Sequence, residues 1–196
     1  MTECLIVTPI AQELVKEVER LTNGKIPVCG CRDETELAER YQGHRVLFGN
    51  PNIIASALDR MPDVEWIQSS WAGVTPLIEH KRRDYVLTGV KDVFGPQMSE
   101  YVFGYLLAHE LKILERKQRQ DCREWHKGHS GMLEGRSIGI MGTGSIGRHI
   151  AKTAHAFGLS VRGLSRTGTK SEHFDVVYDI GNIQTFLEGC HYLVST

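Results

Sequence analysis

The feature that most constrains this chain is a glycine-rich turn that links a short apolar run to a helical pattern. Residues 137–141 predict a buried strand, and they lead directly into the G-x-G-x-x-G sequence of residues 142–147. Apolar and small residues at helical spacing follow over residues 148–157, and residues 159–164 predict a second strand. A strand, this glycine pattern, a helix and a strand within about 30 residues indicate a βαβ unit that binds a dinucleotide.

Each glycine of this pattern has its own physical task. Gly142 permits a tight turn, Gly144 lets the backbone approach a pyrophosphate, and Gly147 lets the helix pack closely on the strand. The amides near Ser145 and Ile146 open the helix and would bind the pyrophosphate at the positive end of the helix dipole. A glycine-rich turn without a ligand is the alternative. The expected cofactor-binding loop comprises Gly142, Thr143, Gly144, Ser145, Ile146 and Gly147.

The residues after the second strand indicate which dinucleotide is bound. NAD-specific domains usually carry an acidic residue about 20 positions into the motif, where it bonds the ribose 2′-hydroxyl. No acid occurs over residues 162–170; instead Ser165, Arg166 and Thr167 follow the strand. Arg166 would pair with a 2′-phosphate, and the two hydroxyl groups would add donors. NADP(H) is therefore favoured over NAD(H), and the alternative is that Arg166 is a solvated surface charge.

The chain before this motif alternates short apolar runs with helical patterns, which predicts βαβ units in a parallel sheet. The expected strands are residues 5–7, 26–29, 46–48, 66–69 and 86–88, and the expected helices are residues 11–21, 34–41 and 53–61. A long helix is expected from about Ser99 to Lys117; because it is apolar over most of its circumference, we expect it to be buried. We place a domain boundary near Ser99.

Composition excludes several classes of function. The 23 Lys and Arg residues against 24 Asp and Glu residues leave a net charge of −1, without the basic surplus that binds nucleic acid. The apolar runs are far shorter than the roughly 18 residues that span a bilayer, and no signal peptide is recognised. Five cysteines without framework spacing favour a reducing cytoplasm. Cys29-x-Cys31 and His126-x-x-His129 are too weak to predict a metal site.

Four stretches, in this order, resemble the D-isomer-specific 2-hydroxyacid dehydrogenase family, close to its glyoxylate/hydroxypyruvate reductase branch. They are Ser69–Val74, Phe94–Tyr101, Leu133–Gly147 and Leu164–Thr167. The resemblance implies an α/β fold, with a flavodoxin-like substrate-binding domain over residues 1–98. It also implies a doubly wound Rossmann domain for NAD(P) over residues 99–196, with the substrate in the cleft between the two domains.

The resemblance also assigns roles to particular residues. The loop amides of Ala72, Gly73 and Val74 would hold the carboxylate of a small 2-oxo acid, which suits backbone N–H groups in a turn. Trp71 would narrow the substrate pocket, and Met98 would lie near the nicotinamide. Two residues, Val194 and Ser195, match the loop that borders the adenosine half of the cofactor, and residues 116–128 match an arm that helps relatives form homodimers.

The catalytic Arg, acid and His of the family have no counterpart among these residues, so no catalytic side chain is expected before position 197. About four strands are expected after residue 136, whereas a complete doubly wound domain has six. The chain therefore resembles a family member truncated within its cofactor domain. We expect an NADPH-dependent oxidoreductase that reduces small 2-oxo acids of the glyoxylate or hydroxypyruvate type to D-2-hydroxy acids; the alternative is a non-catalytic dinucleotide-binding module or an inactive fragment.

Overall fold

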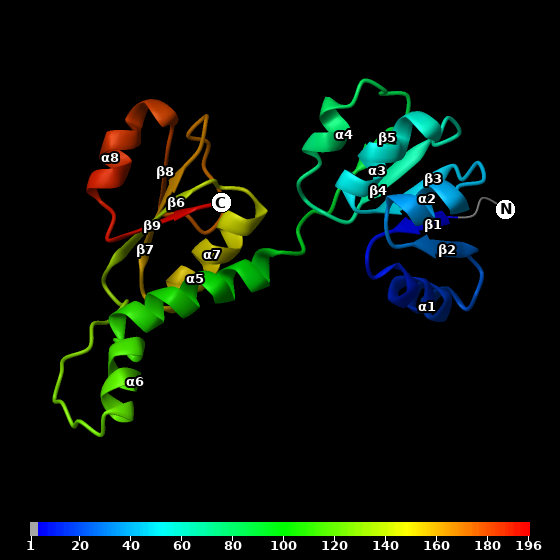
Figure 1. Cartoon of the computed structure of the whole chain (residues 1–196). Helices are drawn as coiled ribbons and strands as arrows, with labels where there is room; N and C mark the ends of the chain where they lie inside the picture. Colours follow the sequence, from blue (N-terminus) through cyan, green and yellow to red (C-terminus); the bar gives the residue numbers. More distant parts are fainter. Residues whose placement is uncertain (1–3) are drawn as a thin grey trace. The chain divides into compact units, whose positions relative to one another are not determined.

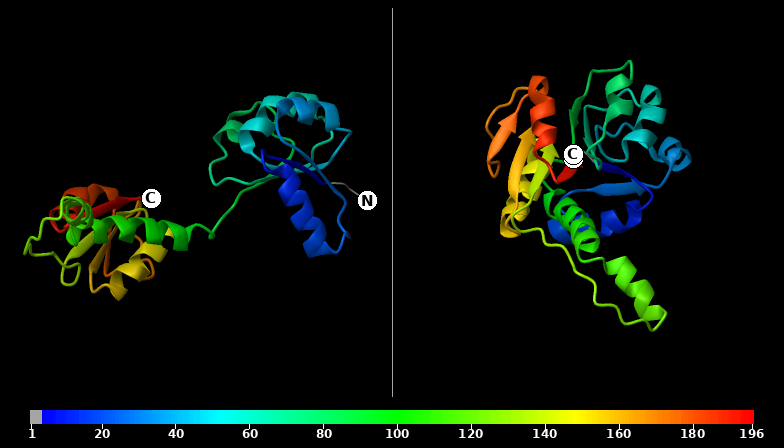
Figure 2. Two further views of the ribbon diagram at one scale, coloured as in Figure 1. Left: turned by 60° about the horizontal axis from the view of Figure 1, so that its bottom comes forward. Right: turned by 90° about the vertical axis from the view of Figure 1, so that its left-hand side faces the viewer.

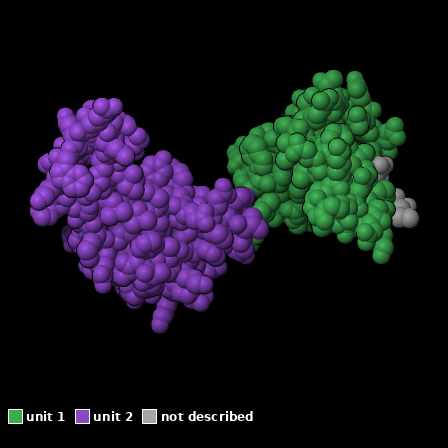
Figure 3. Space-filling model, turned by 90° about the horizontal axis from the view of Figure 1, so that it is seen from below, with its two compact units in different colours: residues 1–91 green, residues 92–196 purple. Residues whose placement is uncertain are grey.

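The computed structural model describes residues 4–196, which form two compact α/β units. Unit 1 comprises the described residues up to Lys91, and unit 2 comprises residues 92–196 (Figure 3). The sequence placed the boundary near Ser99, but the structure divides the chain before helix α5 (Gly95–Glu110). The first turn of α5 already packs within unit 2, where a Cβ atom at Gly95 would lie 2.6 Å from the ring of His149.

Unit 1 is built on a five-stranded parallel sheet with the order β2-β1-β3-β4-β5 (Figure 1). This is the flavodoxin-like order, so the fold class expected for this part of the chain is confirmed. The strands are β1 (Cys4–Val7), β2 (Val28–Cys31), β3 (Val46–Gly49), β4 (Trp66–Ser69) and β5 (Val86–Thr88). The helices are α1 (Ala11–Thr22), α2 (Glu34–Arg40), α3 (Pro51–Ala57), the 3₁₀ turn η1 (Leu58–Arg60) and α4 (Thr75–Glu79).

The core of unit 1 follows from the alternation of side chains along its strands. Leu5, Leu47 and Ile67 pair in register across β1, β3 and β4, and all three are fully buried. They pack with buried residues of α2, α3 and α4, such as Leu37 and Ile54. Helix α1 packs on the opposite face of the sheet at β2, where an added Cβ atom at Gly30 would lie 3.0 Å from the Ala11 side chain.

Unit 2 holds a four-stranded parallel sheet with the order β8-β7-β6-β9. In chain order this is 3-2-1-4, the first four positions of the Rossmann order 3-2-1-4-5-6. The strands are β6 (Ser137–Met141), β7 (Ser160–Leu164), β8 (Val176–Tyr178) and β9 (Tyr192–Ser195). Besides α5, the helices are α6 (Ile113–Asp121), α7 (Ser145–Ala156), the 3₁₀ turn η2 (Ile180–Asn182) and α8 (Ile183–Glu188).

The β6 strand carries the core of unit 2 on both of its faces. Ile138 and Ile140 are fully buried with residues of α5 and α7, including Phe103 and Ile150. Gly139 faces the other way, where an added Cβ atom would lie 2.8 Å from Phe186 of α8. Helices therefore cover both faces of the sheet, as a doubly wound fold requires, and the views of Figure 2 show this arrangement within unit 2.

The expectation of one long helix from Ser99 to Lys117 was wrong. The structure has two helices, because Lys112 adopts a left-handed backbone conformation (φ 52°) between α5 and α6. The expected burial also fails on one side of α5, since Tyr101 and Tyr105 are 60% and 66% exposed. Figure 1 shows α6 and the segment after it projecting from the rest of unit 2.

Two smaller differences concern unit 1. The strand expected at residues 26–29 lies two positions later, at Val28–Cys31, where its backbone pairs with β1. Pro27 has no N–H to donate and contributes only its carbonyl, which accepts from the Cys4 N–H at 3.0 Å. Helix α4 was not expected, and it begins directly after the loop that was assigned to the substrate.

Candidate functional site

The site centres on the carboxyl end of β6, where the strand order of unit 2 reverses. β6 has β7 on one side and β9 on the other, and ligands of open α/β sheets bind at such a switch point. Gly142 follows β6 directly and has a φ of +106°, which disfavours any residue with a side chain. Its N–H donates to the Leu164 carbonyl at 2.9 Å, so the turn crosses from β6 to the end of β7.

The third glycine of the motif joins this turn to α7. A Cβ atom at Gly147 would lie only 2.0 Å from the carbonyl oxygen of Gly142, a distance that no real contact allows. The side chain of Ile140 would be 3.5 Å away. Helix α7 can therefore begin directly over the end of β6 only because position 147 has no side chain.

The second glycine leaves space for a ligand. An added Cβ atom at Gly144 meets nothing within 4 Å among the described residues, and Gly144 is the N-cap of α7. The first N–H groups of a helix have no intrahelical acceptor and carry partial positive charge, and no acidic side chain stands in the first turn of α7. Residues 142–147, here called the phosphate cradle, thus fit the pyrophosphate of a dinucleotide in shape and in charge.

A second loop follows β7 beside the phosphate cradle. The Ser165 side-chain oxygen accepts the Gly168 N–H at 3.0 Å, and Gly168 has a φ of +67°, so these residues form a tight turn. Within this turn the hydroxyl groups of Thr167 and Thr169 are 2.8 Å apart. The side chain of Arg166 is exposed and forms no hydrogen bond or ion pair with any described residue. The turn therefore presents an unpaired guanidinium group.

One acidic residue near this turn was missed from the sequence. Asp179 follows β8, and its backbone forms an isolated bridge with Thr167. Its carboxylate accepts from the Asn182 backbone and side chain at 3.1–3.2 Å and so caps η2. Counting about 20 positions from Gly142 reaches only the end of β7. It therefore cannot find Asp179, which follows the neighbouring strand β8.

Val194 and Ser195, which were matched to the border of the adenosine half, lie at the end of strand β9. Val194 pairs there with Ile140 and Ser195 with Met141. Thr196 follows, and its hydroxyl donates to the Met141 carbonyl at 3.2 Å. The two residues thus reach the same carboxyl edge as the phosphate cradle, on its β9 side.

The residues assigned to the substrate lie at the carboxyl end of β4 in unit 1. The Ser69 hydroxyl bonds both the N–H and the carbonyl of Trp71, at 3.0 and 2.9 Å, and so fixes the start of the loop. Trp71 is 48% exposed, Ala72 and Gly73 are exposed, and Val74 is the N-cap of α4. Met98, on the first turns of α5 in unit 2, is 36% exposed.

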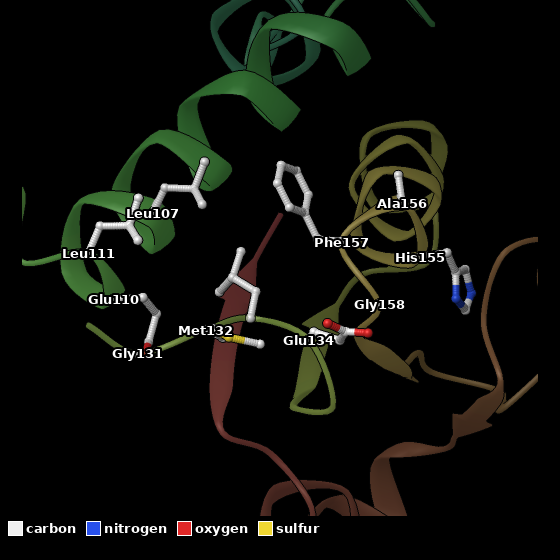
Figure 4. Close-up of a pocket in the computed structure, with 11 residues that line it drawn as sticks. Leu107, Glu110, Leu111, Gly131, Met132, Glu134, His155, Ala156, Phe157 and Gly158 are labelled. Carbon is white, nitrogen blue, oxygen red and sulfur yellow. The ribbon is translucent and has the colours of Figure 1, made fainter. Parts of the chain in front are cut away.

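A buried carboxylate that the sequence did not reveal lies at the opposite end of α7. Glu110 is 6% exposed, and it accepts from the Tyr192 hydroxyl at 2.6 Å and pairs with Arg136 at 3.1 Å. Burial and the neighbouring Glu110 raise the pKa of Tyr192 to about 12. Glu110 borders a cavity of about 570 Å³ beside the C-terminal turn of α7, whose lining includes Leu107, Met132 and Phe157 (Figure 4). This cavity is separate from the phosphate cradle.

Other kinds of site find no support in the part of the chain that the structure describes. Across residues 4–196 no three His, Cys, Asp or Glu side chains are grouped to hold a metal ion. The same residues contain no helix that is both long enough and apolar enough to cross a membrane. The five cysteines are free thiols.

A glycine cradle at the switch point of a 3-2-1-4 parallel sheet defines unit 2 as a dinucleotide-binding domain of the Rossmann type. Residues 103–196 match the family described as D-isomer specific 2-hydroxyacid dehydrogenase, NAD binding domain. Unit 2 therefore carries the NAD-binding domain of the D-isomer specific 2-hydroxyacid dehydrogenase family, as the sequence resemblance implied.

Individual relatives agree with this assignment. The chain is 26% identical over 171 residues to a glyoxylate/hydroxypyruvate reductase A of Arabidopsis thaliana, an alignment that covers 83% of this chain and 54% of that protein. A solved family protein from Aeromonas salmonicida has a TM-score of 0.92 at 32% identity, over 100% of this chain and 64% of that chain. An NADPH-dependent glyoxylate/hydroxypyruvate reductase from Sinorhizobium meliloti, solved with NADP and sulfate, shares the fold with a TM-score of 0.81 at 22% identity, over 100% of this chain and 62% of that chain. The chain thus spans about half to two thirds of the length of these relatives.

Proposed function

We propose that the protein is an NADPH-dependent oxidoreductase that reduces small 2-oxo acids of the glyoxylate or hydroxypyruvate type to D-2-hydroxy acids. The observation that carries the cofactor part is the unpaired guanidinium of Arg166 beside the phosphate cradle. The substrate part is supported by the resemblance to glyoxylate/hydroxypyruvate reductases.

Different residues of unit 2 would bind different parts of the cofactor. The amides of the phosphate cradle, at Gly142, Thr143, Gly144, Ser145, Ile146 and Gly147, would hold the pyrophosphate. Arg166 would pair with the 2′-phosphate, and the hydroxyl groups of Ser165 and Thr167 would add hydrogen bonds. Val194 and Ser195 would border the adenosine half, and Met98 would lie near the nicotinamide. When bound, the cofactor supplies the hydride for reduction of the carbonyl carbon.

The loop after β4 would bind the substrate carboxylate. Backbone N–H groups at Ala72, Gly73 and Val74 lie in the loop after β4, in which Ala72 and Gly73 are exposed, and successive N–H groups in a loop can form a concave anion site. The indole of Trp71 would restrict the length of the acid that fits. Proton donation requires a further side chain, because none of these loop residues has a titratable group.

We extend the proposal to assembly and location. The segment 116–128 projects from unit 2 and includes Trp125, which is 90% exposed, so we assign it to a homodimer contact. Five free thiols suit a reducing cytoplasm.

The cofactor proposal is tested by measuring the dissociation constants of NADPH and NADH for the wild type and for Arg166→Gln. Loss of the charge-assisted pair weakens NADPH binding by roughly 10- to 150-fold, and NADH binding stays unchanged. Arg40→Gln, at an exposed arginine of α2 in unit 1, is the charge-matched control. Equal weakening of both nucleotides, or of neither, would contradict the assignment of Arg166.

The reaction is tested by following NADPH oxidation with glyoxylate or hydroxypyruvate. We expect turnover from the full-length protein and almost none from these 196 residues alone, because a positioned proton donor commonly supplies 10²–10⁴-fold. Robust turnover by residues 1–196 would refute that expectation. Nucleotide binding without turnover in the full-length protein would instead favour a non-catalytic module.

A further inference from the structure

The phosphate cradle has one contact to the loop after β7 that the proposed function does not use. The hydroxyl of Ser171 donates to the backbone carbonyl of Thr143 at 3.1 Å. Thr143 stands between the first two glycines of the cradle, 28 positions away in the sequence. The contact thus links the residues assigned to the pyrophosphate with the loop assigned to the 2′-phosphate.

The methyl group of the Thr143 side chain also lies close to β7. An added Cβ atom at Gly163 of β7 would lie 2.9 Å from the Thr143 methyl group and 2.7 Å from the ring of Phe174. The absence of a side chain at Gly163 therefore lets the threonine methyl group pack against the end of β7. The Ser171 contact then holds the carbonyl of the same residue.

Ser171 itself is anchored rather than carried at the tip of a free loop. It opens a short turn that ends at Phe174, which is 6% exposed within the core of unit 2. The carbonyl of His173 in this turn is 3.1 Å from the His155 ring nitrogen of α7. Asp175, which follows Phe174, forms two hydrogen bonds with the Val161 backbone. The donor hydroxyl is therefore fixed by β7 and α7 together.

The direction of a carbonyl determines the direction of the following amide. A trans peptide unit is planar, so its C=O and N–H groups point to opposite sides. With the Thr143 carbonyl turned toward Ser171, the Gly144 N–H points away from Ser171. Without Ser171, the Thr143–Gly144 peptide is free to rotate, because the backbone dihedral angles of a glycine are the least restricted of any residue.

We propose that Ser171 is a positioning residue, which holds the Thr143–Gly144 peptide in the orientation that presents the cradle amides to the cofactor pyrophosphate. This inference rests on the proposed dinucleotide binding and adds a residue outside the glycine motif. Because the pyrophosphate is common to both cofactors, Ser171 affects NADPH and NADH alike, in contrast to Arg166.

The test compares Ser171→Ala, Ser171→Thr and the wild type in the full 196-residue chain. The dissociation constants of NADPH and NADH, the melting temperature without ligand and the hydrogen-exchange rate of the Gly144 amide are measured. We expect Ser171→Ala to weaken both nucleotides by the same factor, about three- to tenfold, and to speed exchange at Gly144. Ser171→Thr keeps the hydroxyl and restores both affinities to within about twofold of the wild type.

Ser160→Ala is the matched control. Its hydroxyl also donates to a backbone carbonyl, that of Arg136 at 3.4 Å, but at the opposite end of β7. We expect wild-type affinities for this variant. A lower melting temperature with unchanged affinities in Ser171→Ala would reduce Ser171 to a structural role and overturn the proposal. If the wild type binds neither nucleotide, the proposed function itself fails, and this inference fails with it.

Discussion

The two glycines at the start of α7 give the sharpest test of the phosphate cradle, because the same substitution has opposite effects at the two positions. At Gly144 an alanine methyl group meets no described atom within 4 Å, and the backbone has an ordinary φ of −76°. At Gly147 the methyl group would lie 2.0 Å from the Gly142 carbonyl oxygen. Gly144→Ala therefore keeps the fold, whereas Gly147→Ala strains it.

The magnitudes follow from these contacts. The Gly147→Ala methyl group must move at least 1 Å from a backbone atom, which belongs at the upper end of the 1–3 kcal/mol that overpacking costs. For a domain of about 100 residues, each kcal/mol shifts the melting temperature by roughly 4–8 °C, so a fall of about 10 °C or more is expected. Gly144→Ala fills the space assigned to the pyrophosphate. Loss of one charge-assisted hydrogen bond weakens NADPH binding by roughly 10- to 150-fold.

The assay is a thermal melt of each variant with and without NADPH, supported by titration calorimetry. Gly144→Ala should melt within about 2 °C of the wild type without ligand and lose the rise in melting temperature that a bound ligand produces. Gly104→Ala, on α5 where an added Cβ atom also meets nothing within 4 Å, is the control for both readouts. Wild-type NADPH affinity in Gly144→Ala would refute the placement of the pyrophosphate.

Three further outcomes are expected. Because the pKa of Tyr192 is raised to about 12, the protonated hydroxyl contributes fully to the free energy of unfolding below pH 10, and this contribution is lost between about pH 10 and 12. Urea unfolding should show a smaller fall in the free energy of unfolding over this pH range in Tyr192→Phe than in the wild type, and an equal fall would contradict this. Phe103→Ala removes a buried ring stacked 4.9 Å from Phe157 and should cost about 3–5 kcal/mol by urea unfolding, whereas a cost under 1 kcal/mol would show that α5 is not part of the core. Trp71→Ala in the full-length protein should raise kcat/KM for longer 2-oxo acids relative to glyoxylate, and an unchanged preference would remove Trp71 from the substrate pocket.

The sequence predicted the strands of both sheets well, because their apolar runs are short and sharply bounded. β4, β5 and β6 were expected at the residues where the structure has them. The glycine motif also predicted the turn at Gly142, since its chemistry is local. These features depend on neighbours a few positions apart, which a single sequence displays directly.

Features that depend on distant partners could not be predicted. The break between α5 and α6 occurs at Lys112, which is neither glycine nor proline, so nothing in its type signals a left-handed residue. From the sequence, Glu110 has the character of an exposed residue on a helix. Its burial depends on a hydrogen bond from the hydroxyl of Tyr192, which lies 82 positions later. Asp179 reaches the turn after β7 only through the pairing of β8 with β7.

The contact between Thr196 and Gly142 has a practical consequence for anyone who handles this protein. The Thr196 side-chain oxygen lies 2.4 Å from the position that a Cβ atom at Gly142 would take, so position 196 forms the rim of the phosphate cradle. A residue with a side chain at position 142 would therefore press on Thr196 at the end of β9 as well as strain the turn after β6. Substitutions meant to test nucleotide binding alone belong at Gly144 and not at Gly142.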